Sequence, residues 1–426
     1  MKKIRLVTAI SVCTSNLIFC LSPQAKADFL EDSKLTFKTQ NYYYRNDFRD
    51  GTGQNQKAEW AQGFTANFSS GFTSGNVGFG LDAVAMLGLK LDSGPGRTGT
   101  GLLPQHDASD PTKANTKEPG DEYSKLNLTA KVRILDDTLL RLGAIDESGP
   151  LVQPNTSRLF LQTFEGAWIN HKFSDEIQLG GGQFQRVRER DSTDYQPLRI
   201  ATQSGQYRVT NEGEMNLVNL TYKPSKQLSF GYSGGQLEDV YKQHFLGALI
   251  NIPVGPGSIL GDIRTFRSTS DGAAHAGDID NKAFSGQIGY QLSGSTFRVG
   301  YQKMMGSTAF TYLDGTSTYL FSESLIANMN KQNERALMLR FDQDFAPLGF
   351  PGLVASVKHV RGDNAEVHNF ASEGKEWETD MDLGYTIQSG PLKSLSTLWR
   401  HAVYHSNYAR NQEQDRLIFS YPFRIL

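Results

Sequence analysis

Residues 377–388, WETDMDLGYTIQ, alternate strictly between apolar and polar side chains. One face carries Trp377, Thr379, Met381, Leu383, Tyr385 and Ile387, and the other carries Glu378, Asp380, Asp382, Gly384, Thr386 and Gln388. Successive side chains of a strand point to opposite faces, so this stretch predicts a strand with one apolar and one charged face. About six apolar positions, with their neighbours, suffice to cross a bilayer. The pattern recurs along the chain and predicts a transmembrane β-barrel with a wet interior.

The connections between strands support this interpretation. We predict 18 antiparallel strands in an all-β chain, joined alternately by short and long segments. The short ones, 72–76, 135–138, 173–176, 223–227, 253–257, 292–295, 346–352 and 388–392, are rich in the Gly, Pro, Ser and Asp of tight turns. The long ones lie near 46–56, 91–122, 146–162, 191–211, 235–238, 270–280, 306–332, 362–374 and 406–412. Outer-membrane barrels segregate short periplasmic turns from long external loops in this way.

The first 27 residues predict a cleaved targeting segment. A basic start and an apolar stretch from Leu6 to Leu21 precede a small-x-small site, Ala25-Lys26-Ala27. Both cysteines, Cys13 and Cys20, lie in this part. We therefore expect residues 28–426 to form a single barrel domain, exported to the bacterial outer membrane and without disulfides or thiolate metal sites.

Composition argues against several other classes of protein. Removing residues 1–27 takes away four basic and no acidic side chains and leaves a net charge of −6, which gives no footprint for nucleic acid. GPGRTG at 94–99 matches a dinucleotide-binding string, but no helical pattern follows it, so we interpret it as a loop. The eight histidines show no metal-ligand spacing. We expect no cofactor, metal or catalytic residues; the alternative is an outer-membrane enzyme or adhesin that uses the barrel as a scaffold.

The strand alternation also predicts which charged side chains face the interior. The basic set comprises Lys131, Arg133, Arg186, Arg188, Arg264, Arg298, Arg340, Lys358 and Arg400, and the acidic set comprises Glu378, Asp380 and Asp382. A line of guanidinium groups would offer an anion successive binding steps that attract without trapping. The competing interpretation is that these cations pair with the interior acids and stiffen the wall.

The chain resembles the OprD family of outer-membrane porins over essentially its whole mature length. The resemblance is carried by NYYYRNDFR (41–49), LKLDSGPGRTGTGLLP (89–104), RLFLQTFEGAW (158–168), RVRERDSTDY (186–195) and EGKEWETDMDLGYTIQSGPLKSLSTLWR (373–400). It implies a monomeric barrel of 18 strands whose third and seventh external loops fold inward to form a narrow eyelet. It also implies that the basic set guides small carboxylates, either basic amino acids or aromatic acids such as benzoate and vanillate. The expected partners are these substrates, outer-membrane lipids and the barrel-assembly machinery.

In the two loops that this resemblance brings inward, the candidates for the eyelet are Arg158, Tyr312 and Asp314. The aromatic residues of the seventh loop favour an aromatic substrate, or else pack the loop in place. Two positions depart from the family pattern: Leu161 replaces a usual proline, and Leu398 a frequent arginine. These departures imply a looser eyelet and one fewer cation.

Overall fold

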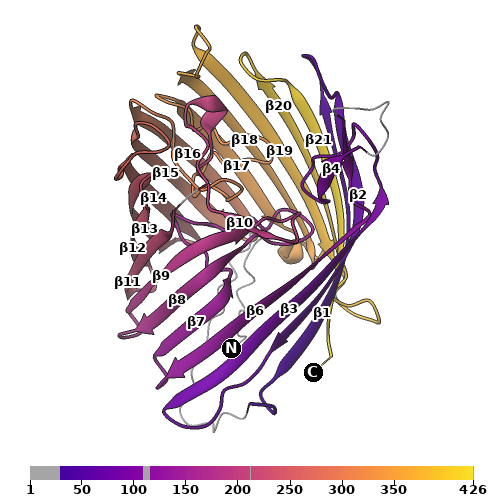
Figure 1. Ribbon diagram of the computed structural model, residues 1–426, viewed down its shortest axis with the longest axis vertical. Coiled ribbons are helices and arrows are strands. Elements are labelled where there is room, and N and C mark those ends of the chain that lie inside the picture. The colour runs from indigo at the N-terminus through magenta and orange to yellow at the C-terminus, as the bar shows by residue number, and fades with distance from the viewer. Residues whose placement is uncertain (1–28, 109–115, 212, 426) are drawn as a thin grey trace.

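The computed structural model describes residues 29–108, 116–211 and 213–425. The predicted targeting segment, 1–27, lies outside the described residues. Within them, no helix is long and apolar enough to cross a membrane. The fold is a closed antiparallel β-barrel of 18 strands, which confirms the predicted fold class (Figure 1).

Each barrel strand pairs with the next along the chain, and the last strand pairs with the first. In order, the strands are β1 (Lys34–Phe48), β2 (Gln56–Ser69), β3 (Val77–Asp92), β6 (Glu122–Ile134), β7 (Thr138–Ile145), β8 (Thr163–Lys172), β9 (Ile177–Arg188), β11 (Met215–Ser225), β12 (Leu228–Leu237), β13 (Tyr241–Val254), β14 (Gly257–Ser270), β15 (Asp280–Leu292), β16 (Ser295–Gly306), β17 (Arg335–Asp344), β18 (Leu353–Ala365), β19 (Gly374–Thr386), β20 (Ser396–Ser406) and β21 (Gln412–Arg424). The remaining elements are short: β4 (Gln105–Asp107) pairs with β5 (Lys117–Pro119), β10 (Tyr195–Pro197) pairs with β9, and η2 (Gln203–Gly205) and η3 (Ala346–Leu348) are single 3-10 turns.

The wall has its apolar side chains outside. On β6, Leu126 and Leu128 are 56% and 50% exposed, whereas Lys125 before them, Asn127 between them and Lys131 beyond them are buried. A soluble sheet shows the reverse, because water favours exposed charge and buried hydrocarbon. The exposed apolar belt is the surface that meets lipid, as the alternation in the sequence predicts.

Three long loops fold into the barrel and pack against its inner wall. They are the third loop (146–162), the fourth (189–214) and the seventh (307–334), and antiparallel bridges join Gln153 to Ser317 and Ile200 to Leu313. Ile200 and Leu313 are fully enclosed among inward-facing wall residues that include Phe164 and Phe184. The inward folding of the third and seventh loops agrees with the prediction. The fourth loop was not predicted to fold inward, although Leu198, Ile200 and Tyr207 gave it apolar residues to bury.

The second loop (93–121) is held by a carboxylate on the inner wall. Glu59 of β2, which is 1% exposed, accepts hydrogen bonds from Thr98 Oγ1 at 2.6 Å, Gly99 N at 2.9 Å and Leu102 N at 3.3 Å. The GPGRTG string lies in this loop, where Gly96 and Gly99 have positive φ angles of 77° and 100° that favour glycine. The string therefore provides tight turns around a buried anchor.

Replacing Glu59 with glutamine should loosen the second loop. The amide offers one neutral acceptor in place of two charged ones, and we expect docking of the loop to weaken by about 1–3 kcal/mol. The measurement is the rate of limited proteolysis within 93–121. The exposed Glu122→Gln is the control, and equal cleavage rates in the two variants would show that Glu59 does not anchor the loop.

Candidate functional site

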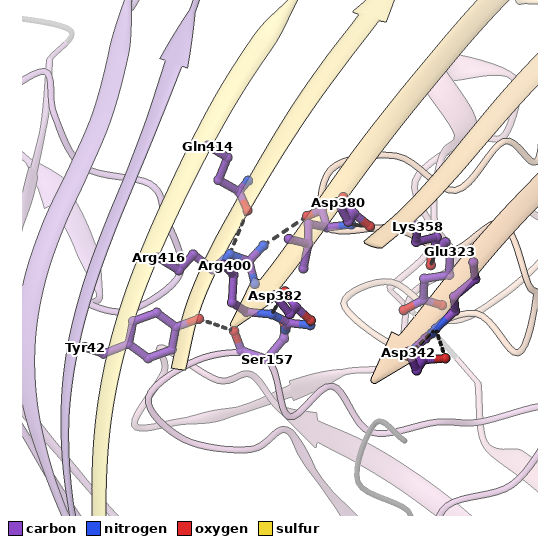
Figure 2. Close-up of polar contacts among 12 residues, drawn as sticks. Tyr42, Ser157, Glu323, Asp342, Lys358, Asp380, Asp382, Arg400, Gln414 and Arg416 are labelled. Atoms are coloured by element: carbon purple, nitrogen blue, oxygen red, sulfur yellow. Dashed lines mark hydrogen bonds and ion pairs between the residues drawn. The ribbon is translucent and has the colours of Figure 1, made fainter. Parts of the chain in front are cut away.

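The registers of β16 to β21 and β1 assemble a continuous charged stripe on the inner wall. In one row Arg298 lies opposite Arg340, which lies opposite Lys358, which lies opposite Asp380. In the next row the order is Asp342, Ser356, Asp382, Arg400, Arg416 and Tyr44. We call these ten positions the inner charged stripe. Several cations are thereby brought together on the inner wall, and Figure 2 shows Lys358, Arg400 and Arg416 among them.

Carboxylates within the stripe balance cations that lie directly opposite one another. Such like-charge pairs are destabilising unless a counter-charge lies between them. Asp342 contacts both Arg298 and Arg340, and its bonds to Arg340 are bidentate, from Nη2 to Oδ1 at 2.8 Å and from Nε to Oδ2 at 3.1 Å. Asp382 binds Arg400 in the same way, at 2.9 and 2.7 Å. Between 20% and 25% of each of these three arginine side chains stays accessible, so the pairing leaves guanidinium surface open to a ligand.

Arg416 is a member of the stripe that our sequence interpretation missed. It is 1% exposed, donates to Gln414 Oε1 at 2.6 Å and to the Leu325 carbonyl at 3.0 Å, and lies 4.7 Å from the centre of the Tyr44 ring. The signal was present in the sequence. Leu417, Phe419 and Tyr421 alternate along the last strand as one apolar face, which turns Arg416 inward.

Arg158 of the third loop approaches the same tyrosine. Its guanidinium lies 5.0 Å from the Tyr44 ring centre and donates to the Thr100 carbonyl at 2.6 Å, and burial lowers the pKa of Arg158 to about 10. Tyr42 donates to the neighbouring Ser157 carbonyl at 3.0 Å, which tethers this loop to β1 (Figure 2). The third loop thus brings a cation beside Arg416, across one aromatic ring.

The other two eyelet candidates, Tyr312 and Asp314, lie at the contact between the fourth and seventh loops. Tyr312 is enclosed by loop and wall residues, and burial raises its pKa to about 12. Asp314 is about half exposed, and its carboxylate lies 4.0 Å from Arg199 of the fourth loop. Both lie where the seventh loop meets the fourth, whereas Arg158 lies against β1 and β21.

Three predicted interior residues hold the seventh loop. Glu378 accepts hydrogen bonds from the backbone N–H groups of Ile326 and Ala327, each at 2.8 Å, and Asp380 accepts from Leu325 N at 3.3 Å. Lys358 donates to the Glu323 carbonyl (Figure 2). We call these contacts the loop-seven latch. These side chains bind backbone groups of the loop, so their contacts are neither the pairing of cations with acids nor an open anion path.

Arg264 also engages the seventh loop. It forms a bidentate pair with Asp262, donates to the Tyr319 carbonyl at 3.2 Å, and lies 3.7 and 4.2 Å from the ring centres of Tyr319 and Phe321. Phe310 and Phe321 are buried against the wall. The aromatic residues of this loop therefore pack it in place, which was one of the two interpretations.

Arg186 and Arg188, which were also predicted to face the interior, do not belong to the inner charged stripe. Val187 is buried with Phe164 and Phe184 inside the barrel, so the exposed Arg186 beside it belongs to the opposite face. The register shifts between Glu165 and Gly166, and the extra residue on β9 reverses the alternation beyond it. Arg186 pairs with Glu165, and Arg188 donates to the Leu126 carbonyl of β6 at 3.0 Å. The prediction that Arg186 points into the interior was wrong for this reason. Arg188 is 9% exposed and also donates to Asn127 Oδ1 at 3.1 Å.

Lys131 and Arg133 lie at the end of β6 near the short turns. Lys131 pairs with Asp82 at 2.6 Å, and both cations lie just over 5 Å from the Phe72 ring centre. Lys131 and Arg133 form a second cationic position that is separate from the inner charged stripe.

One group of side chains has the spacing of a metal site. Ligand atoms of His401, Glu413 and Asp415 lie within 4.8 Å of one another. Arg49 pairs with Glu413, and Asp415 is bound by His401 at 3.0 Å and by Trp399 Nε1 at 3.3 Å. Each ligand group is thus engaged by the protein itself, and the cluster is accounted for as an ion-pair network.

Comparisons with known proteins agree with this geometry. The family model described as "outer membrane porin, OprD family" matches residues 27–425. Porin D of Pseudomonas aeruginosa is 32% identical over 432 residues, covering 95% of this chain and 94% of that protein. The crystal structure of Pseudomonas aeruginosa OpdK with vanillate is 35% identical, with a TM-score of 0.85 over 93% of this chain and all of that one. The structure of OccK5 (OpdH) from the same organism is 39% identical, with a TM-score of 0.83 over 94% of this chain and all of that one.

Proposed function

Because this chain belongs to the OprD family of outer membrane porins, we propose that it is a passive channel for small carboxylates. It is a substrate-specific porin of the bacterial outer membrane and not an enzyme. Our proposal adds the class of substrate, the path it follows and a monomeric functional unit that is inserted by the barrel-assembly machinery.

The observation that carries the proposal is the inner charged stripe. It holds five cations, Arg298, Arg340, Lys358, Arg400 and Arg416, against three carboxylates, Asp342, Asp380 and Asp382. The arginines that remain partly accessible present the planar fork that matches a carboxylate. Neighbouring forks one strand spacing, about 4.8 Å, apart would pass a carboxylate from one to the next.

We propose aromatic carboxylates such as benzoate or vanillate as the first candidates among substrates. The solved relative OpdK was crystallised with vanillate. In this chain Tyr44, which both Arg158 and Arg416 approach, lies at one end of the stripe. A ring beside guanidinium groups would favour a ligand that carries both a carboxylate and an aromatic face.

The test is single-channel recording of the refolded mature protein, titrated in turn with benzoate, vanillate, arginine and glutamate. We expect small conductance steps, anion selectivity, and block by an aromatic acid at lower concentration than by glutamate. Block by arginine first would move the substrate class to basic amino acids. Cation selectivity without block by any of these compounds would contradict the carboxylate proposal.

A further inference from the structure

The outer face of β14 to β18 carries a cluster of cations at the end nearest the long loops. The members are Arg267, Lys282, Lys303, Arg335 and Arg361, which we call the outer basic patch. Their orientation follows from their neighbours in the chain. Phe266, Ala283 and Met304 are buried inside against Phe310, and Ala336 and Val360 against Phe321 and Met329. The five cations therefore point away from the interior.

The patch borders the lipid-facing belt. On the outer face of β16, Tyr301 lies two residues before Lys303, and on β17 Leu337 lies two residues after Arg335. These side chains are 40% and 59% exposed, as expected of groups that meet hydrocarbon. A two-residue step is about 6.6 Å along a strand, so the cations lie where the headgroups of the outer leaflet begin.

Within the patch, like charges face one another across strands. Arg267 lies opposite Lys282, and Lys303 lies opposite Arg335. Asp280 pairs with Arg267 and Asp363 pairs with Arg335 at 2.8 Å. No carboxylate among the described residues forms an ion pair with Lys282, Lys303 or Arg361. Unbalanced cations in adjacent strands destabilise the wall unless an external anion neutralises them.

Other outer-face cations near the same rim have partners in the protein. Arg45 pairs with Asp47 at 2.8 Å, Arg49 pairs with Glu413, and Arg186 pairs with Glu165. The lack of such partners is thus a property of one side of the barrel. It distinguishes the outer basic patch from an ordinary scatter of surface charge.

We propose that the outer basic patch binds the phosphate groups of a glycolipid of the outer leaflet that carries two phosphomonoesters. Each phosphomonoester brings roughly −1.5 to −2 charges at neutral pH, which complements the unpaired cations. Lys303 and Arg361 are two strand spacings and two residues apart, about 12 Å, so one lipid with a phosphate at each end of a disaccharide can reach both. The exposed apolar belt beneath the patch receives its acyl chains.

The experiment uses the full mature protein in neutral detergent and measures the Kd for a fluorescent bisphosphorylated lipid A. The test variant is Lys282→Gln/Lys303→Gln/Arg361→Gln. The matched control, Arg45→Gln/Arg49→Gln/Arg186→Gln, removes three paired cations from the outer face elsewhere. Heat-modifiable migration and unchanged single-channel conductance establish that both variants are folded barrels.

We expect the test variant to raise the Kd roughly tenfold or more and the control to leave it within about twofold of the wild type. Lipid A without phosphates should bind the wild type and the test variant equally weakly. An unchanged Kd in the test variant would overturn the proposal. So would full displacement of the lipid by millimolar inorganic phosphate, because the site would then serve a soluble anion.

Discussion

Replacing Glu378 with alanine should release the seventh loop and raise the conductance of the channel. The carboxylate accepts two backbone hydrogen bonds, from Ile326 and Ala327, at 2.8 Å each. Hydrogen bonds to a charged group contribute about 1.5–3 kcal/mol each, so docking should weaken by about 3–6 kcal/mol. The undocked population would then grow by about two to four orders of magnitude. Single-channel recording should show larger and noisier steps, and protease should cleave 323–328 faster.

Asp47→Asn is the control, because Asp47 lies on the outer face, where it pairs with Arg45 and accepts a hydrogen bond from Gln56, away from the seventh loop. Glu378→Gln should give an intermediate result, since the amide keeps one acceptor oxygen for the two N–H groups. Wild-type conductance in Glu378→Ala, together with unchanged proteolysis, would show that packing of the loop aromatic residues suffices to hold the loop.

The double variant Arg340→Gln/Arg400→Gln should strongly reduce anion uptake. Each change removes a fork that can bind a carboxylate, and it also leaves Asp342 or Asp382 without its bidentate partner. Loss of one charge-assisted contact costs about 1.5–3 kcal/mol, so the block constant for an aromatic acid should rise about tenfold to a hundredfold per position. Reversal potentials in a salt gradient should move toward cation selectivity.

Two further variants separate charge from structure. Arg400→Gln/Asp382→Asn removes the pair and keeps the net charge, so it should weaken block by the acid with a smaller change in selectivity. Arg45→Gln removes a cation from the outer face and should leave both properties at wild-type values. Unchanged block in the Arg340 and Arg400 double variant would exclude the inner charged stripe as the substrate path.

The sequence predicted the barrel well because its strongest signal is local. The alternation at 377–388 reports which face of a strand is wet, and closure then follows from repeating that signal around the wall. The same rule placed Arg298, Arg340, Lys358 and Arg400 on one inner surface. It would also have placed Arg416 there, had the alternation in β21 been applied to it.

What escaped prediction depends on contacts between distant segments. The extra residue in β9 turns Arg186 to the outer face, and nothing in the composition of the strand marks it. Glu378 and Asp380 have the same alternation as Asp382, yet the first two bind backbone N–H groups of a loop that lies some fifty residues earlier, while Asp382 binds an arginine. Alternation gives the direction of a side chain but neither its height nor its partner. Which interior acids bind the seventh loop and which bind an arginine therefore required the fold.

Closure of the barrel joins the two ends of the chain, and this has a consequence for biogenesis. Asn46 donates to Gln412 at 2.9 Å across a separation of 366 residues, and Tyr44 meets Arg416 one step further along the same pair of strands. Contacts of such long range form late, since most of the chain must be in place before they can. A chain stalled before its final strand would lack Arg416 and its pairing with Tyr44. The charged surface we assign to selectivity is thus completed only when assembly is completed, and an unfinished molecule would lack the selectivity of the finished one.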